Sequence, residues 1–325
     1  MNSQPLLSIC IPTYNRAAYL RECLTSLQID GAWDQIEVIV SDNASTDQTL
    51  SVLEDFRDVL PLRWIVQPRN LGADRNFDAV VAEARGEYCW LLGDDDVVIQ
   101  KSLNAIKQEL QSSKPLVLQL GYIQGSSKLD HLKTVLPKKY GLDNSGLLLD
   151  IAAYIQAQEN ISIIFAFISS FVFKRSCWKH SESAKKWFDS NYIHLYQVHT
   201  ALASTGSPII SHLKQPSIVA RGNIANNITA NVGEIMWLDA RTLADVCCTI
   251  YGGQHSIQKA FGELFRRVYP IRTITSVLAQ TLRPIDKKTT SALIYLGYSK
   301  FQLKLAKWLG KPYLRNLAIY FLTKK

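Results

Sequence analysis

Apolar and polar positions follow two different periodicities over residues 1–115. Short apolar runs of strand length alternate with segments in which apolar residues recur at helical spacing. Near-continuous apolar runs are typical of strands buried on both faces, so the alternation predicts an α/β fold with a parallel sheet between helices. The strand-length runs lie at 6–11, 36–40, 62–66 and 88–92, and the helical segments near 16–27, 48–58, 75–84 and 101–110.

Two polar loops contain signals for helix starts. Asn15 follows the first apolar run and can cap a helix that begins near Arg16. Ser45 and Gln48 have capping-box spacing before the next helical segment. We therefore expect both helices to begin directly after the loops that end the strands.

Beyond residue 115 the pattern is less regular. Residues 185–204 mix helical spacing with polar positions, and roughly the last hundred residues are largely helical in pattern. The pattern predicts strands at 116–120, 165–173 and 217–220, a flexible polar segment at 121–146 and a helix at 147–158.

Three adjacent carboxylates, Asp94, Asp95 and Asp96, follow the apolar run at 88–92. Open α/β sheets bind ligands outside the carboxyl ends of their strands, so these acids would lie where a ligand lies. Adjacent like charges disfavour one another's ionisation, and a hard cation such as Mg²⁺ or Mn²⁺ relieves that repulsion. The alternative is a solvated acidic turn in which Asp96 caps the next helix.

Two other strand ends deliver polar residues to the same predicted edge. They are the Thr13–Asn15 loop and Asp42. Polar residues from three strand ends suggest a site for a polar, phosphorylated ligand, although turn and cap chemistry is the alternative for each. No G-x-G-x-x-G or P-loop motif is present, which argues against a dinucleotide-binding fold and a P-loop.

The composition is that of an ordinary globular protein. The chain has 325 residues, 47% hydrophobic and 20% charged, a length that corresponds to roughly two domains. Its six cysteines show no C-x-x-C pair, which indicates buried thiols in a reducing compartment. No signal-peptide pattern is present, and the longest apolar run, at 161–173, is shorter than the about 20 residues of a membrane span. No zinc-finger or RNA-binding signature occurs, so nucleic acid is not an expected partner.

Positive charge is concentrated near the C-terminus. The net charge is +8, but residues 258–325 carry 14 Lys or Arg and two acids, a net +12 that leaves −4 on the rest. Four lysines recur there beside an apolar stripe, a pattern that can lie in an anionic membrane interface. The alternative is an ordinary surface helix whose apolar face packs on the core. The pattern comprises Lys300, Lys304, Lys307 and Lys311 with Phe301, Leu305, Trp308 and Leu309, extended by Tyr313, Arg315, Tyr320, Phe321, Lys324 and Lys325.

Four segments in this order resemble family 2 glycosyltransferases of the GT-A fold: Ser8–Asn15, Val40–Asp47, Asn70–Gly72 and Gly86–Asp96. Within that family the chain resembles abequosyltransferase-type O-antigen enzymes, on the residues Asp42–Asp47, Asp74–Phe77, Tyr88–Trp90 and Arg221–Gly222. The resemblance implies a Rossmann-like, mainly parallel GT-A domain over residues 1–230. Its nucleotide-sugar-binding half would be 1–115 and its acceptor half 116–230, followed by a helical, basic region at 231–325.

The resemblance also implies roles for individual residues. Asp42 would accept hydrogen bonds from the base, Asp94 would face the ribose, and Asp95 with Asp96 would bind the Mg²⁺ or Mn²⁺ that bridges the diphosphate. The family's D-x-D motif, aligned on its last acid at Asp95, has Gly93 in place of its first acid, and Asp94 with Asp96 restores the spacing one residue later. The implied nucleotide-sugar contacts are Pro12, Thr13, Asn15, Asp42, Asn70, Asp74, Arg75, Asp94 and Arg221. For Asn70 the alternative is a turn, and for Arg221 a surface ion pair.

The implied reaction is metal-assisted transfer of a sugar from a nucleotide-sugar to a hydroxyl, with a general base taking the acceptor proton. The family's usual Glu-Asp pair is not recognisable, and the candidate bases are His194 and, after it, Asp189. The implied acceptor is a polyprenyl-diphosphate-linked glycan of surface polysaccharide or O-antigen synthesis. The protein would then be cytoplasmic and peripheral on the inner face of the cell membrane. One alternative is a degenerate, non-catalytic module that binds nucleotide-sugar or membrane. Another is a nucleotidylyltransferase, which requires a Gly-rich N-terminal loop that Pro12–Arg16 does not supply.

Overall fold

The computed structural model describes residues 4–126, 128–130, 132–222, 232–281 and 285–309. The chain divides into two compact units. One is formed by residues 1–149 and 162–223, and the other by residues 150–161 and 224–325. Each unit is described by itself.

Over the described residues, the first unit is built on a nine-stranded mixed sheet. β1 to β4 pair in parallel, whereas β8 joins β4 in antiparallel orientation. Every residue of β1 and β2 is buried, which explains their continuous apolar runs. The strands in sheet order are β3 (Leu62–Val66), β2 (Ile36–Asp42), β1 (Leu7–Thr13), β4 (Tyr88–Leu91), β8 (Phe171–Lys174), β6 (Val117–Gly125), β9 (Ile210–Arg221) and β5 (Val97–Val98), with β7 (Lys133–Val135) beside β6.

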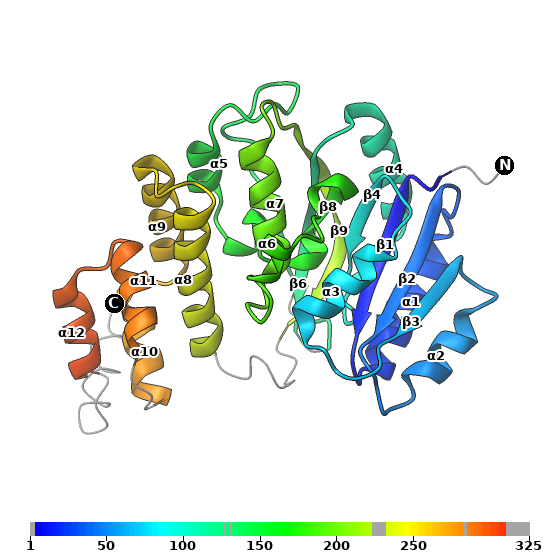
Figure 1. The fold of residues 1–325 in the computed structure, drawn as a ribbon, viewed down its shortest axis with the longest axis horizontal. Helices are drawn as coiled ribbons and strands as arrows, with labels where there is room; N and C mark the ends of the chain where they lie inside the picture. The colour runs from blue at the N-terminus through cyan, green and yellow to red at the C-terminus, as the bar shows by residue number, and fades with distance from the viewer. Residues whose placement is uncertain (1–3, 127, 131, 223–231, 282–284, 310–325) are drawn as a thin grey trace. The chain divides into compact units, whose positions relative to one another are not determined.

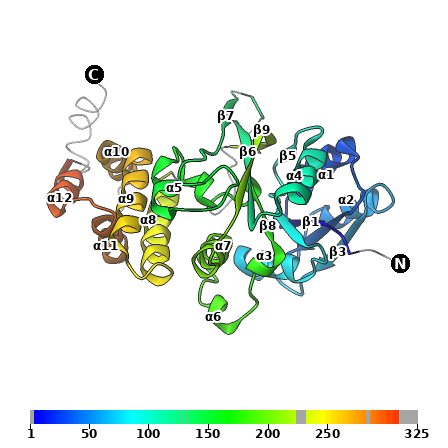
Figure 2. The same ribbon diagram turned by 90° about the horizontal axis from the view of Figure 1, so that it is seen from above.

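Helices cover both faces of this sheet. α1 (Ala17–Asp30) and α4 (Ser102–Ser113) lie on one face, and α3 (Ala73–Ala82) and α7 (Ile193–Ser204) on the other (Figures 1 and 2). α2 (Thr49–Phe56) packs beside α1, and the short α6 (Glu182–Lys185) precedes α7. The predicted α/β class, with parallel strands between helices, is confirmed. The helical spacing that predicts α1 is that of its fully buried residues Leu20, Cys23, Leu24 and Leu27.

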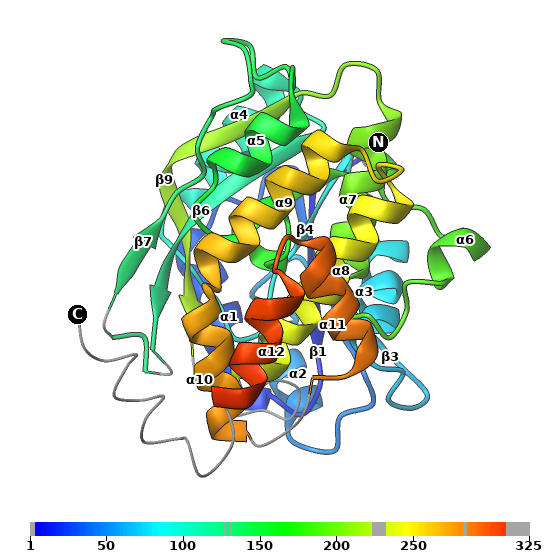
Figure 3. The same cartoon turned by 90° about the vertical axis from the view of Figure 1, so that its left-hand side faces the viewer.

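The second unit is helical over its described residues (Figure 3). α5 packs against α9 and α8 against α11, and Phe261, Leu264 and Phe265 of α9 are fully buried. No helix in the described part of the chain is both long and apolar enough to cross a membrane. The helices are α5 (Ile151–Ala157), α8 (Val232–Thr249), α9 (His255–Val268), α10 (Ile271–Thr281), α11 (Lys287–Tyr295) and α12 (Lys300–Leu309).

The predicted strand over residues 165–173 is wrong for most of its length. β8 begins only at Phe171, after a short 3-10 turn over Ile168–Ser170. Phe165 has a φ of 72°, a left-handed conformation that interrupts an extended run. The Ser169 carbonyl accepts a hydrogen bond from Trp90 Nε1 at 2.9 Å, and its Oγ accepts one from Gly93 N at 2.9 Å. This serine is therefore a polar partner of the segment around β4 rather than a strand residue.

Two further segments differ from the prediction. The polar segment at 121–146 contains regular structure, because β6 extends to Gly125 and β7 pairs with it. The helix predicted over 147–158 begins only at Ile151. Asp150 caps it there, since its side chain accepts hydrogen bonds from the backbone N–H groups of Ala152 and Ala153 at 2.8 and 3.0 Å.

The predicted helix caps are also wrong. Asn15 has a φ of 51°, and its Oδ1 accepts a hydrogen bond from Thr46 N at 2.7 Å instead of capping α1. The N–H of Ala17, the first residue of α1, donates to Asp47 Oδ2 at 2.9 Å, and Asp47 Oδ1 accepts from Thr49 N at 3.1 Å in place of a capping box. The loops after β1 and β2 are thus joined by hydrogen bonds, because their strands are adjacent and parallel.

Candidate active site

The carboxyl ends of β1, β2 and β4 bring polar residues to one edge of the sheet. Thr13 is the register partner of Asp42 on β2, and its Oγ1 donates a hydrogen bond to Asp94 Oδ2 at 2.7 Å. All three residues are buried. Pro12 is buried within β1 directly before Thr13, whereas Asn15 is exposed in the loop that follows. The residues that the sequence places at these strand ends therefore lie together in the structure.

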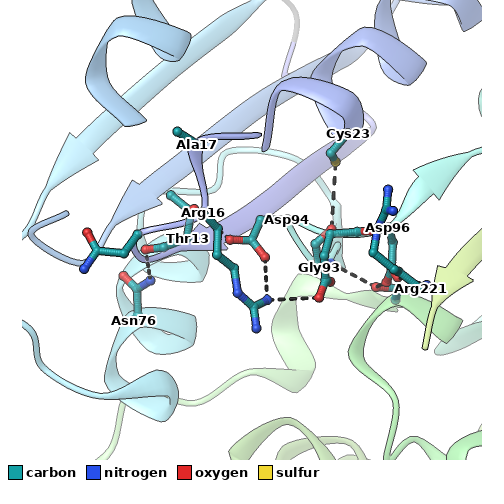
Figure 4. Close-up of polar contacts among 12 residues, drawn as sticks. Thr13, Arg16, Ala17, Cys23, Asn76, Gly93, Asp94, Asp96 and Arg221 are labelled. Carbon is teal, nitrogen blue, oxygen red and sulfur yellow. Dashed lines mark hydrogen bonds and ion pairs between the residues drawn. The ribbon is translucent and has the colours of Figure 1, made fainter. Parts of the chain in front are cut away.

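Arg16 lies between the first two carboxylates of the acidic segment, which we define as Asp94–Asp96. Its Nη1 is 2.9 Å from Asp94 Oδ1 and 3.0 Å from Asp95 Oδ2 (Figure 4). Burial raises the pKa of Asp94 to about 6, and repulsion from Asp95 adds to the rise, whereas the guanidinium of Arg16 opposes it. The sequence pattern predicts Arg16 only as the start of a helix. Its position directly after the loop that ends β1 is the feature that would have indicated a role at the strand edge.

Asp96 points away from Arg16. Its carboxylate accepts hydrogen bonds from Ser169 Oγ and from the backbone N–H of Arg221, the second at 3.1 Å. Burial raises its pKa well above the usual range. The residue before the next helix, α4, is Lys101, so Asp96 is not its cap. Both oxygens of Asp96 already accept hydrogen bonds within the protein, and its role as a metal ligand stays a prediction.

Arg221, the last residue of β9, connects the acidic segment to this strand by hydrogen bonds. Besides the main-chain bond to Asp96, its Nε donates to the carbonyl of Asp95 at 3.1 Å. Its guanidinium pairs with Glu22 and lies 5.0 Å from the ring centroid of Tyr19. These contacts make Arg221 a positioning residue for the acidic segment. Its contact with a diphosphate stays a prediction.

One carboxylate oxygen of Asp42 has no hydrogen-bond partner among the residues that the structure describes. The residue is fully buried, and Oδ1 accepts a hydrogen bond from Ser45 N at 3.0 Å. Oδ2 is also buried, and no group in the described part of the chain donates to it. Leaving a buried polar atom unpaired costs about 1–3 kcal/mol, and an N–H group of a ligand that reached Oδ2 would remove that cost.

Asn70 organises the loop that leads into α3. Its Oδ1 accepts hydrogen bonds from Gly72 N at 2.9 Å and from Asn43 Nδ2 at 3.0 Å. Gly72 has a φ of 83°, a conformation that glycine adopts more readily than other residues. These contacts support the turn-building alternative for Asn70, and its contact with a donor stays a prediction.

Asp74 and Arg75 both contact the loop before α7. The buried carboxylate of Asp74 accepts hydrogen bonds from the backbone N–H groups of Asn191 at 2.7 Å and Ile193 at 3.1 Å, which caps α7 from another helix. Arg75 pairs through both Nη atoms with the exposed Asp189, at 2.5 and 3.1 Å. Both oxygens of Asp74 take part in this capping, and its contact with the nucleotide-sugar stays a prediction.

His194 lies in buried aromatic surroundings. Its Nε2 is 3.1 Å from the carbonyl of Ala166, and the ring centroids of Phe77, Phe171 and Tyr192 lie 5.7–6.3 Å from its own. Burial lowers its pKa to about 4. The enclosed position of the ring, and not its pKa, argues against His194 as the general base. Asp189 remains as the other candidate.

Comparison with known proteins identifies the family. Residues 8–181 match the sequence profile of Glycosyl transferase family 2. The chain belongs to this family. The abequosyltransferase RfbV of Salmonella typhimurium is 26% identical over 316 residues, which cover 94% of this chain and 94% of that protein. The resemblance to family 2 glycosyltransferases, and to abequosyltransferases within it, is confirmed.

Two solved structures share the fold of this family 2 glycosyltransferase. S. aureus TarS in complex with UDP-GlcNAc matches with a TM-score of 0.60 at 16% identity, over 97% of this chain and 91% of that one. The mannosyltransferase PcManGT from Pyrobaculum calidifontis, in complex with GDP-Man and Mn²⁺, matches with a TM-score of 0.51 at 15% identity, over 98% and 86%. The predicted GT-A fold is confirmed.

Membership of family 2 with a GT-A fold implies a divalent metal. The acidic segment offers part of the ligand set that such a metal needs. Among the described residues, no three His, Cys, Asp or Glu side chains are arranged to hold a metal ion. The side chain of Asp95 is 19% exposed, whereas that of Asp94 is 5% exposed. Mg²⁺ is often bound by one or two carboxylates together with substrate phosphates. Asp95 and a donor diphosphate would be such a set.

In the register aligned on Asp95, Gly93 takes the place of the first acid of the family 2 motif, and the structure leaves little room for a side chain at Gly93. A Cβ atom at this position would lie 3.0 Å from Asp95 Oδ1 and 3.0 Å from Asp96 Oδ2. In that register, the carboxylates of Asp95 and Asp96 occupy the space that the side chain of the first acid would need.

Proposed function

We propose that this family 2 glycosyltransferase moves a sugar from a nucleotide-sugar donor to a hydroxyl of a glycan acceptor in surface polysaccharide or O-antigen synthesis. The observation that carries the proposal is the buried Oδ2 of Asp42, which has no hydrogen-bond donor in the described part of the chain and lies at the edge that also holds Asp94 and Asp95. A nucleotide base has N–H donors, and a hydrogen bond to a charged group contributes about 1.5–3 kcal/mol. The abequosyltransferase relative and the complex of TarS with UDP-GlcNAc support a nucleotide-sugar as the donor.

Thr13 and Asp94 would lie on the ribose side of the donor. Thr13 Oγ1 and the Arg16 guanidinium already donate to the carboxylate of Asp94, which fixes its orientation. An ionised carboxylate has further lone pairs that can accept a hydrogen bond from a ribose hydroxyl.

Asp95 would hold Mg²⁺ or Mn²⁺ together with oxygens of the donor diphosphate. A metal bound there stabilises the negative charge that develops on the departing nucleoside diphosphate. The contribution of the chain is the fixed position of Asp95, whose main-chain carbonyl accepts from Arg221 Nε. The Mn²⁺ in the structure of PcManGT supports this assignment.

Asp189 would act as the general base. Its carboxylate is exposed, and the hydrogen bond from Arg75 lowers its pKa below the usual range, so it is ionised at neutral pH. It would take the proton from the acceptor hydroxyl as that oxygen forms its bond to the sugar and the bond between the sugar and the diphosphate breaks.

The helix α12 supports a membrane location for the acceptor. It packs through the buried Leu303 and Ala306, while Phe301, Leu305 and Trp308 are 73%, 42% and 50% exposed. This exposure favours the membrane-interface prediction over the alternative of an apolar face packed on the core. The exposed lysines at 300, 304 and 307 flank it, an arrangement that suits an anionic membrane.

We accordingly propose a polyprenyl-diphosphate-linked glycan acceptor and a peripheral position on the cytoplasmic face of the cell membrane. The remainder of the basic pattern lies outside the described residues. It consists of Lys311, Tyr313, Arg315, Tyr320, Phe321, Lys324 and Lys325.

A donor screen tests the proposed function. The protein is incubated with UDP-, GDP-, CDP- and dTDP-sugars in the presence of Mg²⁺ or Mn²⁺, and released nucleoside diphosphate is measured. We expect slow hydrolysis of one donor class without acceptor. Binding without turnover for every donor, with and without a lipid-linked acceptor, would instead indicate the non-catalytic module, and neither binding nor turnover would refute the proposal.

A further inference from the structure

The guanidinium of Arg16 contacts the two carboxylates at the exposed end of the acidic segment. Arg16 Nη1 contacts both Asp94 and Asp95, and the Arg16 side chain is 28% exposed. Arg221 is the other arginine at the segment, but its guanidinium contacts the main-chain carbonyl of Asp95, Glu22 and Tyr19. Arg16 is thus the positive side chain that meets the carboxylates of Asp94 and Asp95 in the described part of the chain.

The backbone around Arg16 is held from both sides. Before it, Asn15 N donates to Ser45 Oγ at 2.8 Å and Asn15 Oδ1 accepts from Thr46 N. After it, Ala17 N donates to Asp47 Oδ2 at 2.9 Å. The main chain is therefore fixed at the start of α1, and a change of partner at Arg16 would involve its side chain alone.

A divalent cation on Asp95 would be a neighbour of this guanidinium. Like charges at such separations repel, and the repulsion is strong where surrounding groups are buried, as Asp94 and Asp96 are. Metal and Arg16 would therefore compete for the same carboxylate. A diphosphate would relieve the competition, because arginine forms strong charge-assisted hydrogen bonds to phosphate oxygens.

We propose that Arg16 is the resident counter-cation of Asp95, which keeps the affinity for a divalent metal low until a donor diphosphate provides Arg16 with another partner. This inference rests on the proposed function, in which Asp95 is the metal ligand. It makes metal and donor binding cooperative, and Arg16 the residue through which they are coupled. A purely structural ion pair would stabilise the fold without opposing the metal.

Direct titration with Mn²⁺ alone tests this inference without any turnover. Free Mn²⁺ is measured by electron paramagnetic resonance in the donor-free protein, for wild type and Arg16→Gln. Glutamine keeps a hydrogen-bond donor but removes the charge. We expect Arg16→Gln to bind Mn²⁺ about tenfold more tightly or better, the effect of removing a like charge from beside the ion. Adding Asp95→Asn to this variant should abolish the gain.

Arg21→Gln is the matched control, because Arg21 lies on the same helix and pairs with Asp55 instead of the acidic segment. It should bind Mn²⁺ as wild type does. Near-ultraviolet circular dichroism establishes that each variant is folded. Should Arg16→Gln fail to fold, Arg16→Met carries the test with the same expectation, because methionine has a similar length and also removes the charge from beside the ion.

Unchanged Mn²⁺ affinity in the folded variant overturns the inference, and so does the absence of measurable binding in both proteins. Failure of the proposed function would look different. In that case no nucleotide-sugar would be turned over, or Asp95→Asn would leave turnover intact, whatever the Mn²⁺ titration of the Arg16 variants shows.

Discussion

Replacing Asp42 by asparagine should stabilise the empty protein while weakening its hold on a nucleotide. The variant keeps Oδ1 as acceptor for Ser45 N, but it removes the charge from the buried carboxylate whose Oδ2 has no partner among the described residues. Burying an unpaired polar group costs about 1–3 kcal/mol, and a neutral amide is less costly to bury than a carboxylate. We expect the free energy of unfolding to rise by about 1 kcal/mol.

That gain corresponds to an increase in Tm of about 2–4 °C for a domain of this size. Nucleotide binding should move in the opposite direction. The loss of a hydrogen bond to a charged acceptor, about 1.5–3 kcal/mol, would raise Kd by about 10- to 100-fold. Thermal unfolding followed by circular dichroism gives the first quantity, and calorimetric titration with UDP, GDP, CDP and dTDP gives the second.

Asp55→Asn is the control, because Asp55 is a surface acid on α2 that pairs with Arg21. It should change neither Tm by more than about 1 °C nor Kd. An Asp42→Asn protein that is less stable than wild type and still binds its nucleotide with full affinity would refute the reasoning. The carboxylate of Asp42 would then serve the fold and not the ligand.

Three further predictions concern the cap, the buried histidine and the exposed helix. Asp74→Ala should lower the free energy of unfolding by about 2–3 kcal/mol in urea denaturation, because two N–H groups at the start of α7 lose their acceptor, whereas Asp55→Ala should change it by under 1 kcal/mol. Burial lowers the pKa of His194 to about 4, so the unfolded chain binds a proton that the folded protein does not, and stability should fall from about pH 6.5 to pH 4. The fall should be shallower in His194→Gln, and an equal slope in urea titrations across this range would contradict the assignment. The double variant Phe301→Ser/Trp308→Ser should lose binding to anionic liposomes in co-sedimentation at low salt but keep its Tm, since both side chains are exposed; undiminished binding would rule out α12 as the membrane contact.

The sequence predicts the nucleotide half well because its signals are local. The apolar runs of β1, β2 and β4 and the helical spacing of α1 correspond to buried faces, and parallel strand ends necessarily share an edge. The convergence of Thr13, Asp42 and Asp94 follows from that geometry alone.

The parts that the sequence does not predict depend on contacts between residues far apart in the chain. Asp47 caps α1 from the next loop, and Asp74 caps α7 from 117 and 119 residues away. Ser169, which the pattern places in a strand, instead bonds Gly93 and Asp96. No periodicity or local spacing encodes such pairs.

The chemical role of His194 could not be predicted from the sequence either. An unperturbed histidine titrates near pH 6.5 and is a reasonable base, but its environment decides whether it can act. Burial among aromatic rings lowers its pKa to about 4, and that burial results from packing of α7 against the rest of the first unit. The residue type thus suggests a candidate for the general base, whereas the fold determines the environment in which that residue lies.

The proposed function requires the edge formed by Asp42, Asp94 and Asp95 to turn over a nucleotide-sugar. A comparison of kcat/KM for the donor found in the screen, measured with Mn²⁺ for wild type, Asp95→Asn and the surface control Asp55→Asn, tests this requirement. Removing a group that stabilises charge in the transition state typically lowers the rate by about 10²- to 10³-fold. We predict a loss of this size for Asp95→Asn and none for Asp55→Asn. Full activity in Asp95→Asn would contradict the account.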